Sequence, residues 1–236
     1  RQDFAVRTLG MPGAPYAGVC LGRVVTCQSA APLADSGHSW AQTLYHELAH
    51  VFTTQMAGGR ISRWFAEGLS TWEERRRHGA WDWEEGLEQN LATRLATGAL
   101  RPISEFGKTF AEDPRFGYWL ASLLCEHIEG RFGAEGLVRM LREYGKGAGA
   151  RTPVAEMLLA WTGKRDPDVI RAALGIPLEE LDASFRAWLP SRLPAEGVLP
   201  LSFPRQAIPA LERAHASGDP RAGPRLARAR FQHGDK

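Results

Sequence analysis

The stretch "TLYHELAHVFTT", residues 43 to 54, places two histidines four positions apart, with a glutamate directly after the first. Each residue of an α-helix turns by about 100°, so His46 and His50 would stand on one face, where both imidazoles can reach one ion. Glu47 would point to one side of them. This is the H-E-x-x-H pattern of zinc hydrolases, in which the glutamate acts as a general base. A solvated helix that carries these residues without a metal is the competing interpretation.

The flanking residues predict a complete helix of ordinary length. Ser39 with Gln42 three positions later resembles a capping box, and Gly58 with Gly59 supplies a stop signal. The apolar residues would gather opposite the histidines, which gives the helix an apolar back and a polar front. These apolar residues are Trp40, Leu44, Leu48, Val51 and Phe52.

Composition indicates a globular, soluble protein with one substantial domain and a smaller part, because 44% of the 236 residues are hydrophobic and the net charge is +2. Acidic residues balance the arginines, so no nucleic-acid partner is expected. No apolar run approaches the roughly 20 residues of a membrane span. The chain opens on Arg1 without a signal-like segment, so we expect a processed or excised piece, and its compartment stays open. A bacterial origin is expected, and an exported or periplasmic location is slightly favoured.

The cysteines do not form a disulfide framework. Their count is odd, and Cys20 and Cys27 lie seven positions apart on a strand-like segment, where we expect them to point to opposite faces. We interpret these two and Cys125 as small buried residues rather than zinc ligands or nucleophiles.

One strand candidate precedes a largely helical chain. Residues 16 to 28 are rich in β-branched side chains, whereas the later segments carry apolar residues at helical spacing. Shorter helices are expected after Gly133. The expected helices include residues 62 to 77, the segment with Trp83, Leu87, Leu91 and Leu95, residues 115 to 133, and residues 177 to 189.

The C-terminal part differs in composition. Five prolines between positions 190 and 209 interrupt any periodic pattern, so we predict a proline-rich linker over 191–204. Residues 205–236 contain helical spacing on both sides of an "SGDP" turn, which predicts a helical hairpin. The hairpin weakly resembles the start of a tetratricopeptide-type repeat, which would offer a surface to a protein partner; helices that pack on the catalytic domain are the alternative.

A catalytic zinc needs three protein ligands and an open position, so the motif requires a third donor. The metzincin pattern is excluded because Thr53 and Met56 stand where it requires glycine and histidine. Instead, "RWFAEGLSTW" offers Glu67, 17 residues after His50 (67 − 50 = 17), on a second helix. A carboxylate there would complete a site for one Zn²⁺ with His46 and His50.

HELAH followed by "WFAEGLS" resembles the gluzincin metallopeptidases, and more specifically the bacterial peptidase MA-like family. Two further segments, "YWLASLLCEHIEGRFGAEGLVRMLREYGKG" and "GIPLEELDASFRAWL", are similar to the helical lobe of that family. The likeness covers roughly residues 16 to 190. Glycine is unfavourable inside a helix, so Gly68 predicts a close approach of its helix to the histidine helix.

The resemblance implies an α+β, mostly helical fold: a metallopeptidase domain over 1–190, with a small antiparallel sheet and metal helices over about 1–80, a helical lobe over about 81–190, and a C-terminal helical segment. It also implies a tyrosine or histidine that stabilises the oxyanion. Tyr118 is the candidate, with His127 and Tyr144 behind it; a core tyrosine is the alternative.

Two details of the site stay open. Thr71 stands where some gluzincins carry an acidic residue that orients the first histidine, and Glu73 or Glu74 could substitute for it. The strand "GVCLGRVV" could pair with an extended peptide by edge addition, as the resemblance implies. It contains no acidic residue to hold a substrate α-amine, which mildly favours endopeptidase action.

We therefore expect a zinc metallopeptidase that hydrolyses peptide bonds of a peptide or protein substrate. Zinc would activate the attacking water and Glu47 would accept its proton. Two alternatives remain. One is a peptidase-like zinc-binding scaffold, and the other is a zinc hydrolase of a non-peptide amide.

Overall fold

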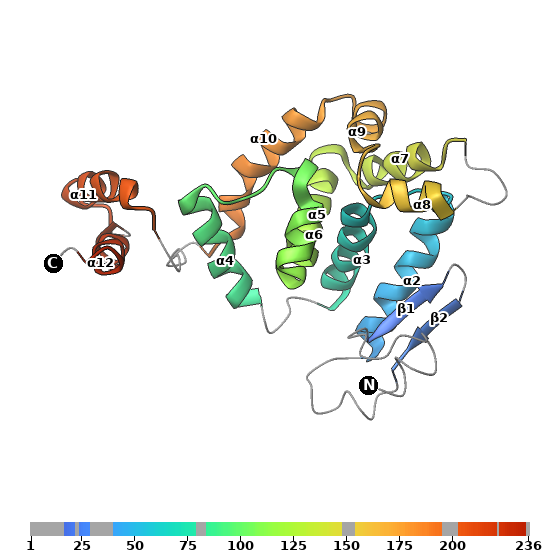
Figure 1. Cartoon of the computed structure of the whole chain (residues 1–236), viewed down its shortest axis with the longest axis horizontal. Helices are drawn as coiled ribbons and strands as arrows, with labels where there is room; N and C mark the ends of the chain where they lie inside the picture. Colours follow the sequence, from blue (N-terminus) through green and yellow to red (C-terminus); the bar gives the residue numbers. More distant parts are fainter. Residues whose placement is uncertain are drawn as a thin grey trace. The chain divides into compact units, whose positions relative to one another are not determined.

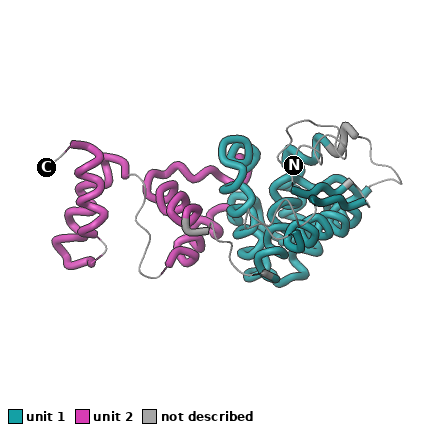
Figure 2. The backbone as a smooth tube through the Cα atoms, turned by 90° about the horizontal axis from the view of Figure 1, so that it is seen from below, with its two compact units in different colours: residues 1–79, 106–181 teal, residues 80–105, 182–236 magenta. Residues whose placement is uncertain are grey.

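The computed structural model describes residues 17–21, 24–28, 40–78, 84–147, 154–194, 203–220 and 222–234. Figure 1 shows a mostly helical α+β chain with one small antiparallel sheet, as expected from the sequence. The chain divides into two compact units, residues 1–79 with 106–181 and residues 80–105 with 182–236 (Figure 2). The first unit contains the H-E-x-x-H motif. The domain limits expected from the sequence remain a prediction.

Two helices carry the motif residues. Helix α2 (Trp40–Met56) holds the histidines, and helix α3 (Arg63–His78) holds Glu67. Gly58 and Gly59 adopt positive φ angles of 59° and 73°, a conformation that favours glycine, so they end α2 as predicted. Ser39 of the expected capping box lies outside the described residues.

The strand candidate at residues 16 to 28 forms a hairpin rather than one strand. β1 (Gly18–Leu21) pairs antiparallel with β2 (Val24–Cys27), and Figure 1 shows the hairpin beside α2. Only two positions separate Leu21 from its partner Val24, and a glycine first in that sequence interval is a hairpin signal that the sequence already contained.

This reversal corrects the expectation for the cysteines. Gly18 is opposite Cys27 and Cys20 is opposite Val25. Residues opposite one another, and residues two apart in a strand, share a face, so the two cysteines point to the same face rather than to opposite faces. As expected, Cys20, Cys27 and Cys125 are not joined in disulfides; Cys125 is buried and the other two are half-buried.

Helix α3 lies at the centre of the first unit, between α2 and α6 (Pro114–Phe132). The expectation for Gly68 was wrong in its partner. A Cβ there would lie 2.6 Å from the carbonyl oxygen of Ala121 in α6, so the glycine permits close approach of α3 to α6 and not to α2. This contact fixes the face of α3 that carries Glu67 toward α2.

The remaining helices of the first unit complete its core. α6 begins at Pro114, where Asp113 accepts a hydrogen bond from the Phe116 amide, and it ends at Gly133 as predicted. Phe65, Phe116 and Trp119 are among the fully buried side chains. The described part of this unit also contains α5 (Phe106–Glu112), α7 (Ala134–Gly145), α8 (Val154–Trp161) and α9 (Asp166–Leu174).

The second unit contains helix α4 (Glu84–Thr97), the 3₁₀ turn η2 (Ile103–Glu105) and most of α10 (Leu178–Trp188). Asp182 accepts a hydrogen bond from the Ile103 amide at 2.8 Å, which ties η2 to α10. Two further 3₁₀ turns, η3 (Leu189–Arg192) and η4 (Arg205–Ala207), lie in the proline-interrupted region.

A helical hairpin ends the described chain, as the "SGDP" turn predicted. α11 (Ile208–Ala216) and α12 (Ala222–Gln232) pack together around Phe203, Ile208 and Leu226. Whether the hairpin begins a repeat array remains a prediction.

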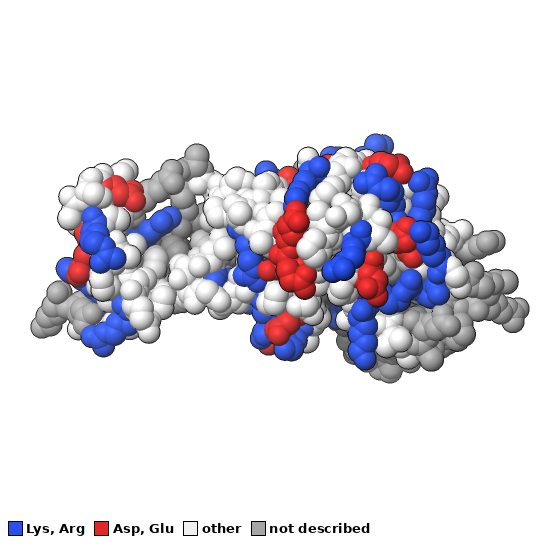
Figure 3. All heavy atoms as spheres, turned by 90° about the horizontal axis from the view of Figure 1, so that it is seen from above, with Lys and Arg blue, Asp and Glu red and all other residues white. Residues whose placement is uncertain are grey.

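The molecular surface carries both charge signs. On the face shown in Figure 3, Lys and Arg side chains are interspersed with Asp and Glu. Within the described ranges, no helix is both long and apolar enough to cross a bilayer.

Candidate metal centre

Three side chains of the first unit converge as the sequence predicted. His46, His50 and Glu67 each offer one donor atom, and the three atoms lie within 4.8 Å of one another. The pairwise distances are 3.2 Å between the two Nε2 atoms, 3.4 Å from His46 Nε2 to Glu67 Oε2, and 3.2 Å from His50 Nε2 to Glu67 Oε2. Tetrahedral zinc with bonds of about 2.0–2.1 Å would separate its ligand atoms by about 3.3 Å. The arrangement therefore fits a zinc ion held by three protein ligands.

Both histidines present their second nitrogen to an oxygen atom. His46 Nδ1 lies 3.3 Å from Glu74 Oε2, and His50 Nδ1 lies 3.2 Å from Ser70 Oγ. An ionised carboxylate only accepts hydrogen bonds, so Glu74 selects the tautomer of His46 that leaves Nε2 free. Partners of this kind orient the histidines of metal sites and raise their basicity.

Glu74 resolves the alternative that the sequence left open. It follows Glu67 by two helical turns and reaches His46, whereas Glu73 pairs with Arg76 at 2.8 Å. Thr71 is fully buried, and its hydroxyl has no hydrogen-bond partner among the described residues.

The charges of the triad are coupled in the absence of a cation. Burial lowers the pKa of His46, but hydrogen bonds to Glu67 and Glu74 outweigh it and raise the pKa to about 10. Burial raises the pKa of Glu67, yet hydrogen bonds from His46 and His50 outweigh it and lower the pKa to about 2. The site therefore favours a positive charge beside the Glu67 carboxylate, and a bound metal cation would supply that charge.

Glu47 lies beside the triad and is 8% exposed. Burial raises its pKa, with a further contribution from Glu67, while His46, His50 and the backbone N–H of Cys20 act in the opposite direction. A carboxylate with a raised pKa is a better proton acceptor near neutral pH than an ordinary glutamate.

Strand β1 positions this glutamate from the other side. A Cβ at Gly18 would lie 2.8 Å from Glu47 Cγ and 2.9 Å from Glu47 Oε1, so only glycine permits this approach. The Gln28 amide donates to the Ala17 carbonyl, and alternation along an antiparallel pair then directs the Cys20 N–H away from β2. The edge of β1 that does not pair with β2 therefore faces Glu47, and the Cys20 N–H donates a hydrogen bond to the Glu47 carboxylate.

Tyr118, the candidate oxyanion donor, comes from α6. Its ring centroid lies 6.3 Å from that of His46, and the side chain is half-buried. The structure thus places a phenol next to a proposed metal ligand, where it can approach a substrate. Its role in catalysis remains a prediction.

The two reserve candidates are less suitable. His127 is 8% exposed, and burial, with help from Arg131, lowers its pKa. Tyr144 is fully buried, and its hydroxyl hydrogen-bonds to Asp166 and, at 3.0 Å, to Ser62. That hydroxyl has its partners inside the core, so it is not available to a substrate.

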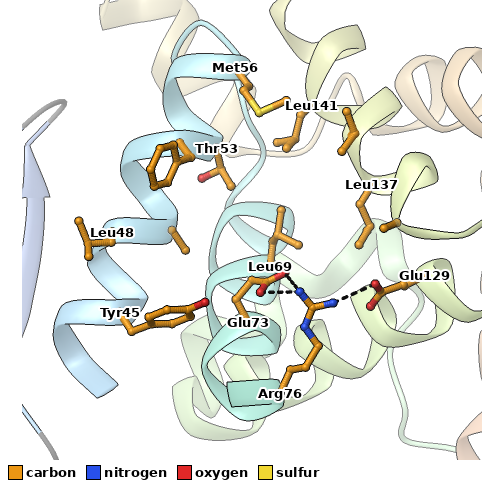
Figure 4. Close-up of a pocket in the computed structure, with 14 residues that line it drawn as sticks. Tyr45, Leu48, Thr53, Met56, Leu69, Glu73, Arg76, Glu129, Leu137 and Leu141 are labelled. Atoms are coloured by element: carbon orange, nitrogen blue, oxygen red, sulfur yellow. Dashed lines mark hydrogen bonds and ion pairs between the residues drawn. The ribbon is translucent and has the colours of Figure 1, made fainter. Parts of the chain in front are cut away.

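The back of α2 is apolar, as expected, but it is not covered in the described structure. Leu48 is 41% exposed and Phe52 is 67% exposed, whereas Thr43, Glu47 and Thr53 of the polar front are buried. A cavity of about 360 Å³ lies beside this apolar face, and Figure 4 shows the side chains that line it. α2, α3, α6 and α7 line it, and Arg76 bridges Glu73 and Glu129 at its rim.

Two functional contacts were missed by sequence reasoning. Ser70 follows Glu67 by three positions, so helical spacing could have placed it on the metal-facing side of α3. The approach of Gly18 to Glu47 is a contact between distant segments, and only the glycine itself signalled it.

Comparison with models of known protein families, with curated proteins and with solved structures gave no match. The assignment of chemistry to this site therefore depends on its own geometry.

Proposed function

We propose that the protein is a zinc-dependent metallopeptidase that hydrolyses peptide bonds, with endopeptidase action favoured. The main support is the triad of His46, His50 and Glu67, whose metal-binding atoms are 3.2–3.4 Å apart. The buried Glu47 lies beside the triad and is not one of its members. Bound zinc would supply a Lewis acid that polarises the scissile carbonyl and lowers the pKa of water.

The remaining steps belong to side chains and backbone of this chain. In this proposal, Glu47 accepts a proton from the attacking water and passes it to the leaving amine. Tyr118 can donate its hydroxyl proton in a hydrogen bond to the oxyanion that develops on the carbonyl oxygen. Glu74 and Ser70 hold the imidazoles in position.

The edge of β1 that does not pair with β2 gives a reason to favour peptides over other amides. An extended substrate strand that paired with this edge, and took over the Cys20 N–H from Glu47, would lie beside the triad with its scissile bond close to Glu47.

Glu47→Gln tests the proposal, because the amide keeps the shape of the side chain but cannot act as a base. We expect zinc content and melting temperature to be retained while hydrolysis of a diverse peptide library falls at least about 10²-fold. Tyr118→Phe should cause a smaller loss, expressed in kcat more than in KM. Zinc-loaded wild-type protein that cleaves no peptide, with Glu47→Gln binding its partners equally well, would instead support the scaffold alternative.

A further inference from the structure

Arg63 opens helix α3 one turn before Glu67, so both side chains lie on the same face of the helix. Its guanidinium carbon lies 4.7 Å from the centroid of the Phe110 ring and 6.0 Å from that of the Trp161 ring. Both rings belong to the first unit. Among the described residues, the contacts of this guanidinium are therefore with aromatic rings and not with hydrogen-bond acceptors.

Within the described ranges, Arg63 has no carboxylate partner. Its Nε is buried without an acceptor, although the side chain as a whole is half-buried. Two other arginines of α3 do pair with carboxylates. Arg75 Nη1 lies 3.7 Å from Glu126 Oε2, and Arg76 Nη2 lies 2.8 Å from Glu73 Oε2. A half-buried guanidinium without an anion is costly to desolvate, and its planar fork matches a carboxylate.

A row of contacts connects Arg63 to the proposed metal ligands. The Phe110 ring that it covers packs edge-on against the Tyr118 ring, with 5.3 Å between ring centroids. The centroids of the Tyr118 and His46 rings are 6.3 Å apart. One helical turn separates Arg63 from Glu67, which is about 6 Å along the axis, and an extended peptide advances about 3.3 Å per residue. A group on a bound peptide within about three residues of the scissile bond can therefore reach the guanidinium.

We propose that Arg63 forms a carboxylate-binding subsite, which gives the proposed peptidase a preference for substrates with an acidic side chain or a C-terminal carboxylate close to the scissile bond. The spacing between the bound carboxylate and the scissile bond rests on the proposed function. Binding of a carboxylate to Arg63 can be tested without cleavage. Phe110 and Trp161 hold the guanidinium in place, so little side-chain freedom is lost when the carboxylate binds.

The test uses dye-labelled alanine–leucine decapeptides blocked at both ends, with a single glutamate or a single glutamine moved along the chain. Binding is measured by fluorescence anisotropy to zinc-loaded Glu47→Gln protein, which should not cleave them, and cleavage is measured with the wild-type active site. We expect about 10-fold tighter binding of the glutamate peptide at one register, since a charge-assisted bidentate hydrogen bond is lost in the glutamine peptide.

Three variants on the Glu47→Gln background test whether Arg63 causes the preference. Arg63→Gln should abolish the preference for glutamate, and Arg63→Lys should keep only part of it because it retains the charge without the planar fork. Arg192→Gln is the matched control, since Arg192 also covers an aromatic ring, Trp188 at 5.4 Å, but belongs to the second unit. It should leave the preference intact. Zinc content and circular dichroism establish that each variant is folded.

The outcomes separate the two proposals. Equal binding of glutamate and glutamine peptides at every register, or a preference that survives Arg63→Gln, overturns the carboxylate subsite even if peptides are cleaved. A preference that depends on Arg63, in a protein that cleaves no peptide, supports the subsite and overturns the peptidase.

Discussion

Two polar clusters lie in the first unit, and they differ in whether their hydrogen-bonding atoms match one another. In the first, two imidazole nitrogens and a carboxylate oxygen of His46, His50 and Glu67 point at a common centre. In the second, Asp166 accepts hydrogen bonds from the Trp64 indole at 2.5 Å and from the Tyr144 hydroxyl. The first cluster brings three lone-pair atoms together without a hydrogen-bond donor for each, whereas in the second cluster each acceptor oxygen faces a hydrogen-bond donor.

This difference separates a site from a structural network. The cluster around Asp166 satisfies its members without any added group, and a buried network of this kind fixes the packing of α3, α7 and α9. The triad places acceptor atoms 3.2–3.4 Å apart, which is favourable only if a proton or a cation lies between them. Burial is a weaker distinction, because Glu67 is buried like Asp166 while His46 and His50 are half-buried.

The largest expected effect comes from removing a donor of the triad. Glu67→Ala should lower zinc affinity by at least about 100-fold, since the loss of a ligand should exceed the 10–100-fold cost typical of an outer partner. Competition with a chromophoric chelator measures the affinity. Tyr144→Phe is the matched change in the second cluster and should leave zinc affinity unchanged while the free energy of unfolding falls by about 1–3 kcal/mol.

If Glu67→Ala retained full zinc affinity, the assignment of the ligands would be wrong. If Tyr144→Phe lost zinc without any loss of stability, the distinction between the two clusters would not hold.

The second prediction uses the pH dependence of the network. Burial raises the pKa of Asp166 from 3.8 to about 6, although hydrogen bonds from Tyr144, Trp64 and Ser62 oppose the rise. The folded protein therefore holds this proton more tightly than the unfolded chain. The stabilisation is complete below pH 3.8 and is lost as the pH rises to about 6, by up to about 3 kcal/mol.

Asp166→Asn removes this titration, so it is the reference. Urea unfolding of both proteins between pH 4 and pH 7, with chelator present to exclude metal effects, should show wild-type stability falling relative to the variant across that window. Parallel curves would show that Asp166 is not held protonated in the folded state.

The third prediction concerns the outer partner of the triad. Glu74→Gln should weaken zinc binding by about 10–100-fold, because the amide no longer presents a charged acceptor to His46 Nδ1. Glu73→Gln is the neighbouring control, since Glu73 pairs with Arg76 and should leave zinc affinity within about 2-fold. Equal losses in the two variants would indicate a general charge effect rather than orientation of His46.

The sequence predicted the triad because its members follow local rules. His46 and His50 are one helical turn apart, and Glu67 lies on the next helix after a glycine stop, so periodicity and turn signals placed them on adjacent helices. The resemblance of "WFAEGLS" to the gluzincins then singled out Glu67. The long helices and the C-terminal hairpin were recognised for the same reason.

Contacts between distant segments could not be predicted in this way. The partner of Gly68 was assigned to α2, yet it is Ala121, because the spacing of a glycine does not identify the element that approaches it. The reversal within residues 16 to 28 and the choice of Glu74 over Glu73 depended on small rotations that a periodic pattern does not resolve. The cluster around Asp166 joins residues about a hundred positions apart and had no local signal.

The smallest effect is expected from the second unit, which provides a reference for both clusters. The hairpin α11–α12 has its own apolar cluster of Phe203, Ile208, Leu226 and Ala229, to which Ala96 of α4 and Leu211 add. Removal of residues 203–236 therefore takes away a separate core together with the helices that form it.

We expect zinc affinity to stay within about 2-fold of the full chain, because no ligand or outer partner lies in the removed segment. The melting transition of the shortened chain should remain cooperative, with at most a small shift from the exposure of Ala96. Calorimetry and the same chelator competition test both points. A large fall in melting temperature together with weaker zinc binding would show that the hairpin supports the metal centre and that the two clusters do not depend on the first unit alone.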